Sequence, residues 1–448
     1  MGKKRNAKRN GLTKNTPYKL LPQIRSELTD IVDQLFKKCT KVPTPASSPS
    51  QEWEKFLQIY QLVEKIREIE KDIVLPSYDR EEQAESFLQW LKENDAEVDG
   101  VEICSFEQEG LGLKTTKALQ EGDLVLSIPK KLVMSEETAR KSYLGSLIEK
   151  DPILHHMGNV SLSLHLLGEY VTKQFQNIAR QYSYFYRIFH SLPEARSWPI
   201  RDYFTFDSYR WAVSIVMTRL NRIPAPDSIG QLGLIPGWDM ANHEHGVFST
   251  DFDETKDSIT CFAHRNFACS EQFCIYYGQR SNAEFFLHSG FVYKDNPSDT
   301  YALKLGVSKS DPLYEEKSNF LSSVSLSVNG SFPLVQGKLP VSPDLLCFTR
   351  VFCMDKEALS HWRKEDRKAY SLRRDNCNMG ASFDEKVDTF LHTRVSLLLK
   401  SYPTSLEEDL EALKTCSGFE RLIRSLLIEE KKMLKASLIF LSAKLPKK

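Results

Sequence analysis

Leu234-Ile-Pro-Gly-Trp-Asp-Met-Ala-Asn-His-Glu-His245 is the stretch around which the rest of this chain is organised. After an apolar Leu-Ile-Pro entry it brings an aromatic ring, a carboxylate, a carboxamide and two imidazoles close together. A second stretch, Ile275-Tyr-Tyr-Gly-Gln-Arg-Ser-Asn-Ala-Glu-Phe285, joins two tyrosines and a turn-forming glycine to a helix-like run. Strand and turn sequence separates the two stretches, so we expect them to meet in space.

Their side chains predict a small-molecule pocket. Asn242 and His243 would form its hydrogen-bonding floor, and the rings of Trp238, Tyr276 and Tyr277 its wall. An apolar lining with a few placed polar groups is the usual composition of such a site. Plainer interpretations stay open: the amide and imidazole can cap a loop, and one of two adjacent strand tyrosines points into the core.

A metal site is not expected. Asp239, His243 and His245 do not have a familiar zinc spacing, and no fourth ligand is evident. The nine cysteines form no CxxC pair, which favours a reducing compartment over disulfides or cysteine-bound zinc.

Composition is that of a globular protein of two or three domains. The chain has 448 residues, is 41% hydrophobic and has a formal net charge of zero, so neither nucleic acid nor membrane is expected as a partner. No apolar run approaches the roughly 18 residues that span a bilayer. Basic residues crowd the first ten positions, and we expect residues 1–20 to be a disordered tail, with a localisation or nucleic-acid patch as the alternative.

The predicted secondary structure then changes several times along the chain. Apolar residues at helical spacing predict a helical region over 21–97, with helices at 22–40, 53–73 and 81–93. From Val98, three short strands follow, joined by glycine turns. Within them Gly110-Leu-Gly112 lacks a dinucleotide fingerprint; it is either a plain hairpin turn or one that a ligand approaches closely.

Helical spacing returns over about 150–225. The unbroken pattern from Leu164 to Phe189 predicts one long helix, and Phe206–Leu220 another that Pro224-Ala-Pro breaks. Residues 247–277 are strand-like. After Tyr293 the sequence is helical to its end, and the candidate helices there are 342–353, 383–401, 405–415 and 419–440.

The order of these signals is strand, Gly-x-Gly, strand, helical insert, Asn-His and Tyr-Tyr-Gly. Five longer motifs accompany it: Ala179-Arg-Gln-Tyr-Ser-Tyr-Phe-Tyr, Arg210-Trp-Ala-Val-Ser-Ile-Val-Met-Thr-Arg-Leu-Asn221, Trp238-Asp-Met-Ala-Asn-His243, Tyr277-Gly-Gln-Arg-Ser-Asn-Ala-Glu and Leu305-Gly-Val-Ser-Lys-Ser-Asp. The pattern resembles the SET-domain methyltransferases, within them the Rubisco large-subunit methyltransferase group, and most closely the actin-histidine N-methyltransferases.

This resemblance implies an α+β fold. A SET β-fold with a helical insert is followed by a helical substrate-binding domain of the Rubisco methyltransferase type. We expect the SET domain over 98–295 with its insert at about 150–225, the substrate-binding domain over 296–440, and a tail over 441–448.

The resemblance also implies a function and a set of site residues. The chain would be an enzyme that methylates the tele nitrogen of an actin histidine with S-adenosylmethionine, acting as a monomer in the cytoplasm, with the nucleus as a second location. Asn221 and Tyr277 would be catalytic, and Trp238 and Arg280 would bind the target peptide. The cofactor would be bound by Arg80, Glu109, Gly110, Leu111, Arg219, Asp239, Asn242, His243 and Ser289.

Asn221 carries the choice of target. Lysine-specific relatives generally have an aromatic residue there, whereas a carboxamide can hydrogen-bond one imidazole nitrogen and leave the other aimed at the methyl group. Histidine, with an ordinary pKa of about 6.5, is mostly neutral near neutral pH and needs orientation more than a base.

The chain departs from the family after Leu167. The family has a Trp-Pro-Tyr…Leu-Pro segment of a few tens of residues there, whereas here Gly168 runs on directly to Asn177-Ile-Ala-Arg-Gln. A catalytically silent SET-like protein that binds actin or another partner, and a lysine methyltransferase, therefore remain as alternatives.

Overall fold

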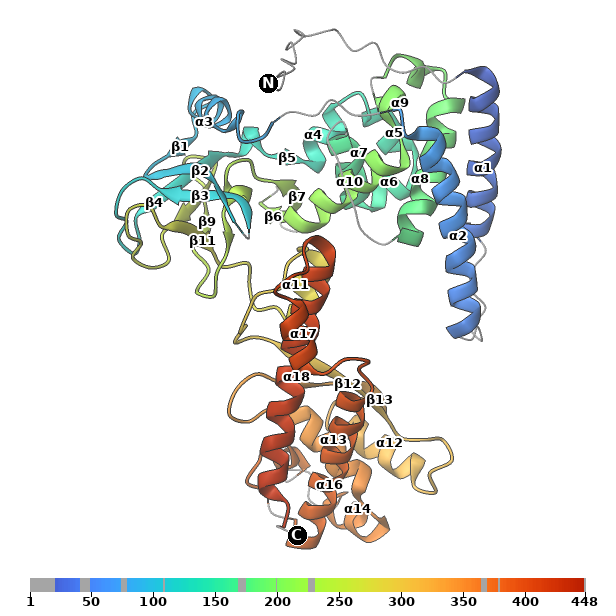
Figure 1. Cartoon of the computed structure of the whole chain (residues 1–448), viewed down its shortest axis with the longest axis vertical. Coiled ribbons are helices and arrows are strands. Elements are labelled where there is room, and N and C mark those ends of the chain that lie inside the picture. The colour runs from blue at the N-terminus through green and yellow to red at the C-terminus, as the bar shows by residue number, and fades with distance from the viewer. Residues whose placement is uncertain are drawn as a thin grey trace, which may run out of the picture. The chain divides into compact units, whose positions relative to one another are not determined.

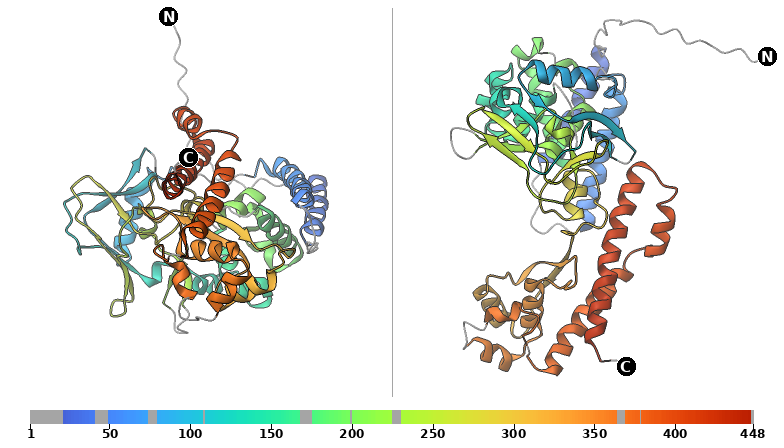
Figure 2. Two further views of the ribbon diagram at one scale, coloured as in Figure 1. Left: turned by 90° about the horizontal axis from the view of Figure 1, so that it is seen from below. Right: turned by 90° about the vertical axis from the view of Figure 1, so that its left-hand side faces the viewer.

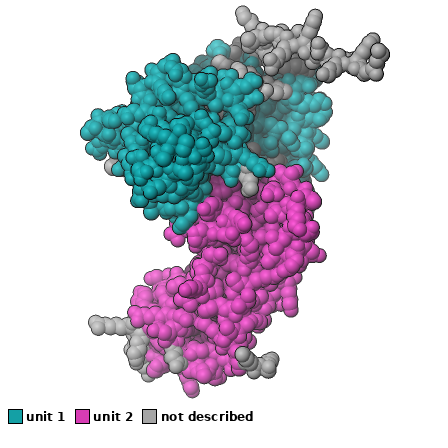
Figure 3. All heavy atoms as spheres, turned by 60° about the vertical axis from the view of Figure 1, so that its left-hand side comes forward, with its two compact units in different colours: residues 1–276 teal, residues 277–448 magenta. Residues whose placement is uncertain are grey.

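The computed structural model describes residues 21–40, 49–73, 79–107, 109–167, 175–198, 200–224, 230–363, 369–377 and 379–446. The predicted N-terminal tail and the proline-rich linker after residue 40 lie outside these ranges. The chain divides into two compact units, residues 1–276 and 277–448 (Figure 3).

Helices open the first unit. α1 (Pro22–Thr40) and α2 (Pro49–Glu70) run side by side (Figures 1 and 2), and the short helix α3 (Ala84–Glu93) follows them. The apolar stripe of α1, with Leu28, Val32 and Leu35 buried, packs against α2 and α8 (Phe175–Ser191). Three helices were predicted here, and their positions are confirmed to within a few residues.

Short strands form three sheets in this unit. The first has the order β1-β4-β10-β9, the second β2-β3-β11-β8 and the third β5-β7-β6. Their bounds are β1 (Glu97–Val98), β2 (Val101–Phe106), β3 (Gly110–Thr115), β4 (Leu124–Pro129), β5 (Met134–Ser135), β6 (Asn221–Ile223), β7 (Gln231–Leu234), β8 (Asn242–His243), β9 (Thr250–Asp253), β10 (Ser258–Phe262) and β11 (Gln272–Ile275). The strands predicted after Val98 correspond to β2, β3 and β4.

The predicted helical insert lies between β5 and β6. It contains α4 (Glu136–Lys141), α5 (Gly145–Lys150), α6 (Pro152–His156), α7 (Gly158–Leu167), α8, α9 (Ile200–Tyr203) and α10 (Phe206–Arg219), with a 3-10 turn, η2 (Glu194–Ser197). In Figure 1 these helices lie beside the sheets, between them and α1–α2. Their core is largely aromatic, with Tyr182, Phe185, Phe189 and Tyr209 fully buried.

The single helix predicted from Leu164 to Phe189 falls partly on residues 168–174, which lie outside the described residues; its flanks are the helices α7 and α8. The helix predicted over Phe206–Leu220 is confirmed to within one residue, because α10 ends at Arg219, ahead of Pro224. Leu220 already has extended backbone angles (φ −65°, ψ 129°), so Asn221 can begin strand β6.

The second unit is mainly helical. α13 (Pro343–Cys353), α16 (Ala381–Lys400), α17 (Leu406–Ala412) and α18 (Gly418–Lys444) correspond to the four predicted helices, and α11 (Asn282–His288), α12 (Tyr314–Ser323) and α14 (Lys356–Arg363) add to them. The mainly helical character expected after Tyr293 is confirmed, but one strand pair within it was not predicted. β12 (Thr300–Gly306) and β13 (Asn329–Val335) pair antiparallel over seven residues each and bury Leu303, Phe332 and Leu334 against α13.

Candidate functional site

The order of the second sheet brings together the two stretches around which the chain is organised. β11 pairs antiparallel with β3, placing Phe273 opposite Leu113, and parallel with β8, placing Cys274 opposite Asn242 and Ile275 opposite His243. Asn242 and His243 are therefore strand residues, and the alternative in which they cap a loop does not hold. This short parallel pairing fixes the positions of both residues in the sheet.

The carboxamide of Asn242 is oriented by three neighbours. Its Nδ2 donates to Oε1 of Gln272 at 2.8 Å and to the carbonyl of Leu111 at 3.4 Å. A Cβ atom on Gly112 would lie 2.6 Å from that nitrogen, so only glycine leaves room for the amide. The donor group is thus committed to the protein, and Oδ1 is left as an acceptor for a ligand. Gln272 was not predicted as part of the site; in the sequence it looks like the first residue of an ordinary strand.

His243 is held by the turn that follows it. The backbone amide of Glu244 donates to the carbonyl of Ile275 at 3.1 Å, and Arg265 makes a two-pronged ion pair with the Glu244 carboxylate at 2.8 and 2.9 Å. Such a bidentate pair is among the stronger charged hydrogen bonds and restricts rotation. The Glu244–Arg265 pair therefore anchors the chain at the point where it leaves β8.

A 3-10 turn, η3 (Trp238–Met240), supplies the next group of predicted residues. Arg219, in the last turn of α10, donates to the carbonyl of Asp239, and its Nη1 lies 3.8 Å from the Asp239 carboxylate. Burial raises the pKa of that carboxyl, and the positive charges of Arg219 and Arg80 oppose the rise. The exposed Arg80 is thus close enough to act electrostatically on the turn. These contacts join three segments far apart in the sequence.

The Trp238 indole forms part of a wall. Its Nε1 donates to Oγ1 of Thr250 at 2.8 Å, which fixes the ring plane. Burial raises the pKa of the neighbouring Cys261 thiol to about 11, so that cysteine stays neutral behind the ring. Gly237, with φ of 78°, makes the sharp turn into Trp238 that other residues rarely adopt.

Tyr276 is the centre of an aromatic cluster. Its ring centroid lies 5.8 Å from that of His243, 5.7 Å from His245 and 5.2 Å from Phe248. β11 ends at Ile275, so Tyr276 and Tyr277 both follow the strand. The expectation that strand alternation sends one of them into the core therefore does not apply.

Asn221 stands at the start of β6, two residues after Arg219. Its Nδ2 donates to the carbonyl of Arg219 at 2.9 Å, and the side chain is half-buried. This local bond turns the other end of the carboxamide, Oδ1, away from the helix end. An acceptor in a fixed direction is what is needed to receive an N–H from a substrate.

The hairpin turn predicted to approach a ligand begins β3. Glu109 and Gly110 are exposed and Leu111 is half-buried. Gly110 has φ of 73°, and a Cβ built on it would meet nothing within 4 Å, so its backbone borders open space. Gly112, two residues on, closes against Asn242 instead. The two glycines therefore have different roles, an open edge and a close contact.

Three predicted site residues belong to the second unit. The ring of Tyr277 lies edge-on to Phe291 at 6.2 Å, and the Arg280 carbonyl accepts a hydrogen bond from Asn296 at 2.8 Å. Ser289 ends α11, where its amide donates to the carbonyl of Phe285, and its Oγ is buried with no hydrogen-bond partner among the described residues. The roles predicted for these three residues stay predictions.

Within the described ranges, no cluster of three or more histidine, cysteine or acidic side chains is arranged to hold a metal ion. No helix of the same ranges is long and apolar enough to cross a membrane.

Comparison with known proteins adds to this geometry. A family model described as Rubisco LSMT substrate-binding matches residues 308–434. The actin-histidine N-methyltransferase of Gallus gallus is 40% identical over 434 residues, which cover 87% of this chain and 73% of that protein. The protein of the same name from Homo sapiens is 39% identical over 436 residues, covering 87% and 72%.

Solved structures agree on the fold. The SET domain of LSMT bound to lysine and AdoHcy superposes with a TM-score of 0.59 at 18% identity, covering 82% of this chain and 92% of that one. Rubisco LSMT bound to AdoMet gives 0.58 at 20% identity, covering 83% and 92%. The predicted fold class, a SET β-fold with a helical insert and a helical substrate-binding domain, is confirmed.

Proposed function

This chain belongs to the actin-histidine N-methyltransferase family, and we propose that it transfers a methyl group from S-adenosylmethionine to the tele nitrogen of an actin histidine. The observation that carries the proposal is the 40% identity extending over 87% of the chain. The site supports it because the amides of Asn221 and Asn242 are held by hydrogen bonds from Nδ2, which leave the acceptor oxygens for ligands.

The residues of the first unit fit the cofactor. S-adenosylmethionine carries an amino-acid end, a hydroxylated ribose and an adenine ring, which call for mixed polar groups and a close approach to backbone. Gly110 borders open space, Asn242 offers Oδ1, and Arg80 and Arg219 bring positive charge to the turn at Asp239. We propose that Glu109, Leu111 and His243 also bind the cofactor, and the family resemblance suggests the same role for Ser289, whose hydroxyl is buried.

Bound S-adenosylmethionine supplies a methyl group activated by its sulfonium sulfur. The chain's own part is to present a neutral imidazole in line with that group and to exclude water. Oδ1 of Asn221 accepts the N–H of the pros nitrogen, which holds the ring as the tautomer whose tele nitrogen has a free lone pair. The family resemblance assigns contacts with the target peptide to Trp238, Tyr277 and Arg280, and the aromatic ring of Tyr277 can stack on an imidazole.

No general base is required in this arrangement. Because neutral histidine already has a nucleophilic lone pair near neutral pH, only orientation limits the transfer. After transfer, the methylated ring is cationic and loses its pros N–H proton to water. A lysine target would instead lose its proton before reaction, since its ordinary pKa is about 10.4.

Replacing Asn221 by Phe tests the proposal. The change removes the acceptor and leaves an apolar wall, so methylation of a histidine-bearing actin peptide should fall by about 5- to 150-fold, the equivalent of about 1–3 kcal/mol. Methylation of the lysine-substituted twin peptide should fall much less. The assay is methyl incorporation into both peptides at matched cofactor between pH 6 and 9.

Two controls accompany this experiment. Calorimetric titration with S-adenosylmethionine shows whether the chain binds cofactor at all, and a version carrying the family segment after Leu167 shows whether that segment governs activity. An unchanged histidine-to-lysine ratio in Asn221→Phe would remove Asn221 from target choice. Cofactor binding without methylation in either version would favour a catalytically silent binding protein.

A further inference from the structure

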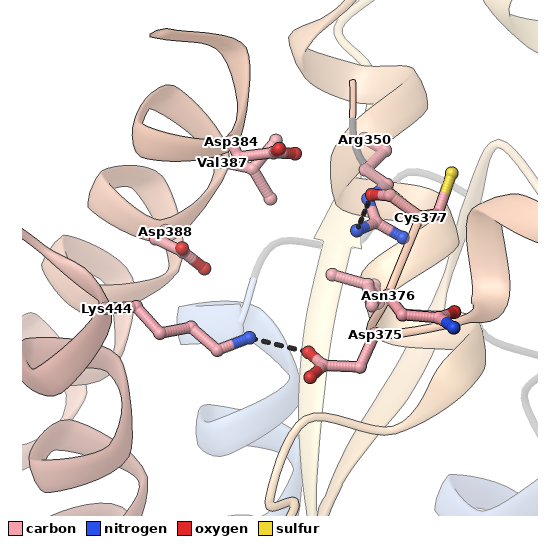
Figure 4. Close-up of a pocket in the computed structure, with 9 residues that line it drawn as sticks. Arg350, Asp375, Asn376, Cys377, Asp384, Val387, Asp388 and Lys444 are labelled. Carbon is pink, nitrogen blue, oxygen red and sulfur yellow. Dashed lines mark hydrogen bonds and ion pairs between the residues drawn. The ribbon is translucent and has the colours of Figure 1, made fainter. Parts of the chain in front are cut away.

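A cavity of about 220 Å³ lies within the second unit and is lined by none of the site residues discussed so far (Figure 4). It is enclosed by α13, the loop after the 3-10 turn η4 (Tyr370–Arg373), α16 and the last turn of α18. This volume is below that of usual drug-sized pockets and suits one long side chain. The lining residues are Leu346, Arg350, Asp375, Asn376, Cys377, Asp384, Val387, Asp388 and Lys444.

The charges of this cavity do not cancel. Lys444 pairs with Asp375 at 2.6 Å and closes one end, which uses one charge of each sign. Asp384 and Asp388 are four residues apart on α16, so they share one helix face and repel each other. Only the guanidinium of Arg350 remains to balance these two carboxylates among the lining residues.

Arg350 is committed elsewhere for most of its donors. It is 4% exposed; Nη1 donates to the carbonyls of Leu372 and Arg374 at 2.7 Å, and Nη2 to that of Cys377 at 2.9 Å. Its Nε is buried and has no hydrogen-bond partner among the residues that the structure describes. A buried donor without an acceptor costs free energy. Arg350 is held by three backbone carbonyls and is therefore fixed in place beside the cavity.

The carboxyl group of Asp388, on α16, lacks a cation of its own among the described residues. Burial raises the pKa of its carboxyl, Lys444 opposes the rise, and Asp384 and Asp375 add to it. Figure 4 shows Asp384, Val387 and Asp388 on one side of the cavity and Arg350, Asn376 and Asp375 on the other. An occupant that carries a positive charge toward α16 would balance these carboxylates.

We propose that this cavity binds the protonated side chain of one arginine or lysine of the protein substrate. A basic residue within a peptide offers both a cation and backbone carbonyls, and its aliphatic stem would lie against Leu346 and Val387. The inference rests on the proposed function in that the residue belongs to the methylated protein. The matched family model covers 308–434 and is described as substrate-binding, which agrees with a contact in this unit.

The binding test uses the full chain and four small probes. N-acetyl-arginine N-methylamide and N-acetyl-lysine N-methylamide carry the cation and the amides, the citrulline analogue lacks the charge, and methylguanidinium lacks the amides. Titration calorimetry should detect binding of the arginine amide or of the lysine amide. The citrulline analogue should bind at least about tenfold more weakly. Equal binding of the charged and uncharged amides overturns the proposal, and methylguanidinium binding as tightly as the amide overturns a peptide as the source.

Variants of α16 separate ligand binding from structure. Asp388→Asn and Asp384→Asn keep the shape of the side chain and remove its negative charge. Each should weaken binding of the basic probe by about tenfold or more. Glu385→Gln, an exposed change on the same helix, should leave it unchanged. Asp388→Asn should keep or raise the thermal midpoint, because it removes like-charge repulsion. A lowered midpoint with unchanged probe affinity would make Asp388 structural and overturn the inference.

Turnover distinguishes this inference from the proposed function. If the wild type methylates actin, Asp388→Asn should raise the KM for actin by about tenfold and leave kcat unchanged. An unchanged KM overturns the inference while the proposed function stands. Absence of methylation by the wild type and by the version with the family segment contradicts the proposed function, and the probe titrations still decide whether the cavity binds a basic side chain.

Discussion

Replacing Glu70 by Gln should remove a strong pH dependence from the stability of the first unit. The Glu70 carboxylate is 4% exposed at the end of α2. It accepts hydrogen bonds from the hydroxyl of Tyr182 on α8 and from the backbone amide of Phe206, which begins α10, at 2.7 Å for the latter. One side chain thus joins α2 to two helices of the insert core. Burial raises its pKa to about 8, and the hydrogen bonds from Tyr182 and Phe206 only partly oppose that rise.

The sign of the effect follows from proton binding. An unfolded Glu70 ionises near pH 4.5, whereas the folded one ionises near 8, so between these values the folded state holds one more proton. Stability therefore falls as pH rises, by about 1.4 kcal/mol for each pH unit. From pH 5 to pH 8 the loss amounts to about 3.5 kcal/mol at most, since part of the transition lies outside that range.

The Glu70→Gln variant would resemble the protonated wild type at every pH. Its amide offers one acceptor oxygen to the two donors, Tyr182 and Phe206, so the variant should be no more stable than the wild type at pH 5. At pH 8 it should be more stable, because it buries no charge. The assay is urea unfolding followed by circular dichroism between pH 5 and 8. Glu68→Gln, on an exposed part of the same helix, is the control. A stability difference between wild type and Glu70→Gln that stays constant across this range would refute the reasoning.

Two further substitutions test the site and the second unit. Gly112→Ala should weaken binding of S-adenosylmethionine by at least about tenfold in calorimetry, because the new Cβ would displace the amide of Asn242. Gly110 borders open space, so Gly110→Ala should cost only backbone strain. Similar losses in both would argue against the Asn242 contact. Lys431→Met should destabilise the second unit by about 3–5 kcal/mol in urea unfolding, because it removes the fully buried one of the two cations that pair with Asp409. A loss below about 1 kcal/mol would show that Arg424, also paired with Asp409 at 3.1 Å, suffices alone.

Many site residues could be selected from the sequence because their chemistry is local. Trp238, Asp239, Asn242 and His243 stand within one short stretch, so a single turn and strand carry all four. Their partners could not be found in this way. Gln272 is thirty residues away from Asn242 and is an ordinary strand residue by pattern, and only the parallel pairing of β8 with β11 makes it a hydrogen-bond partner.

The strand that follows α10 was not predicted. Apolar spacing predicted a helix over Phe206–Leu220, and α10 ends one residue earlier, at Arg219. Spacing could not show that Asn221 then pairs with Gly233 in the third sheet. Pairing with a distant strand leaves no local signal, and β12 and β13 were missed for the same reason.

The sequence by itself determined the helix and strand periods, the SET-type order of motifs and the candidate side chains for the chemistry. These depend on neighbours within a few residues, where spacing and residue type are sufficient evidence. Only the tertiary structure decided which way those side chains face. It also decided that Arg350, Asp384 and Asp388 share one cavity, because charges from separate helices meet only when the helices pack. The free energy of a buried charge depends on these distant neighbours, and local pattern carries no information about them.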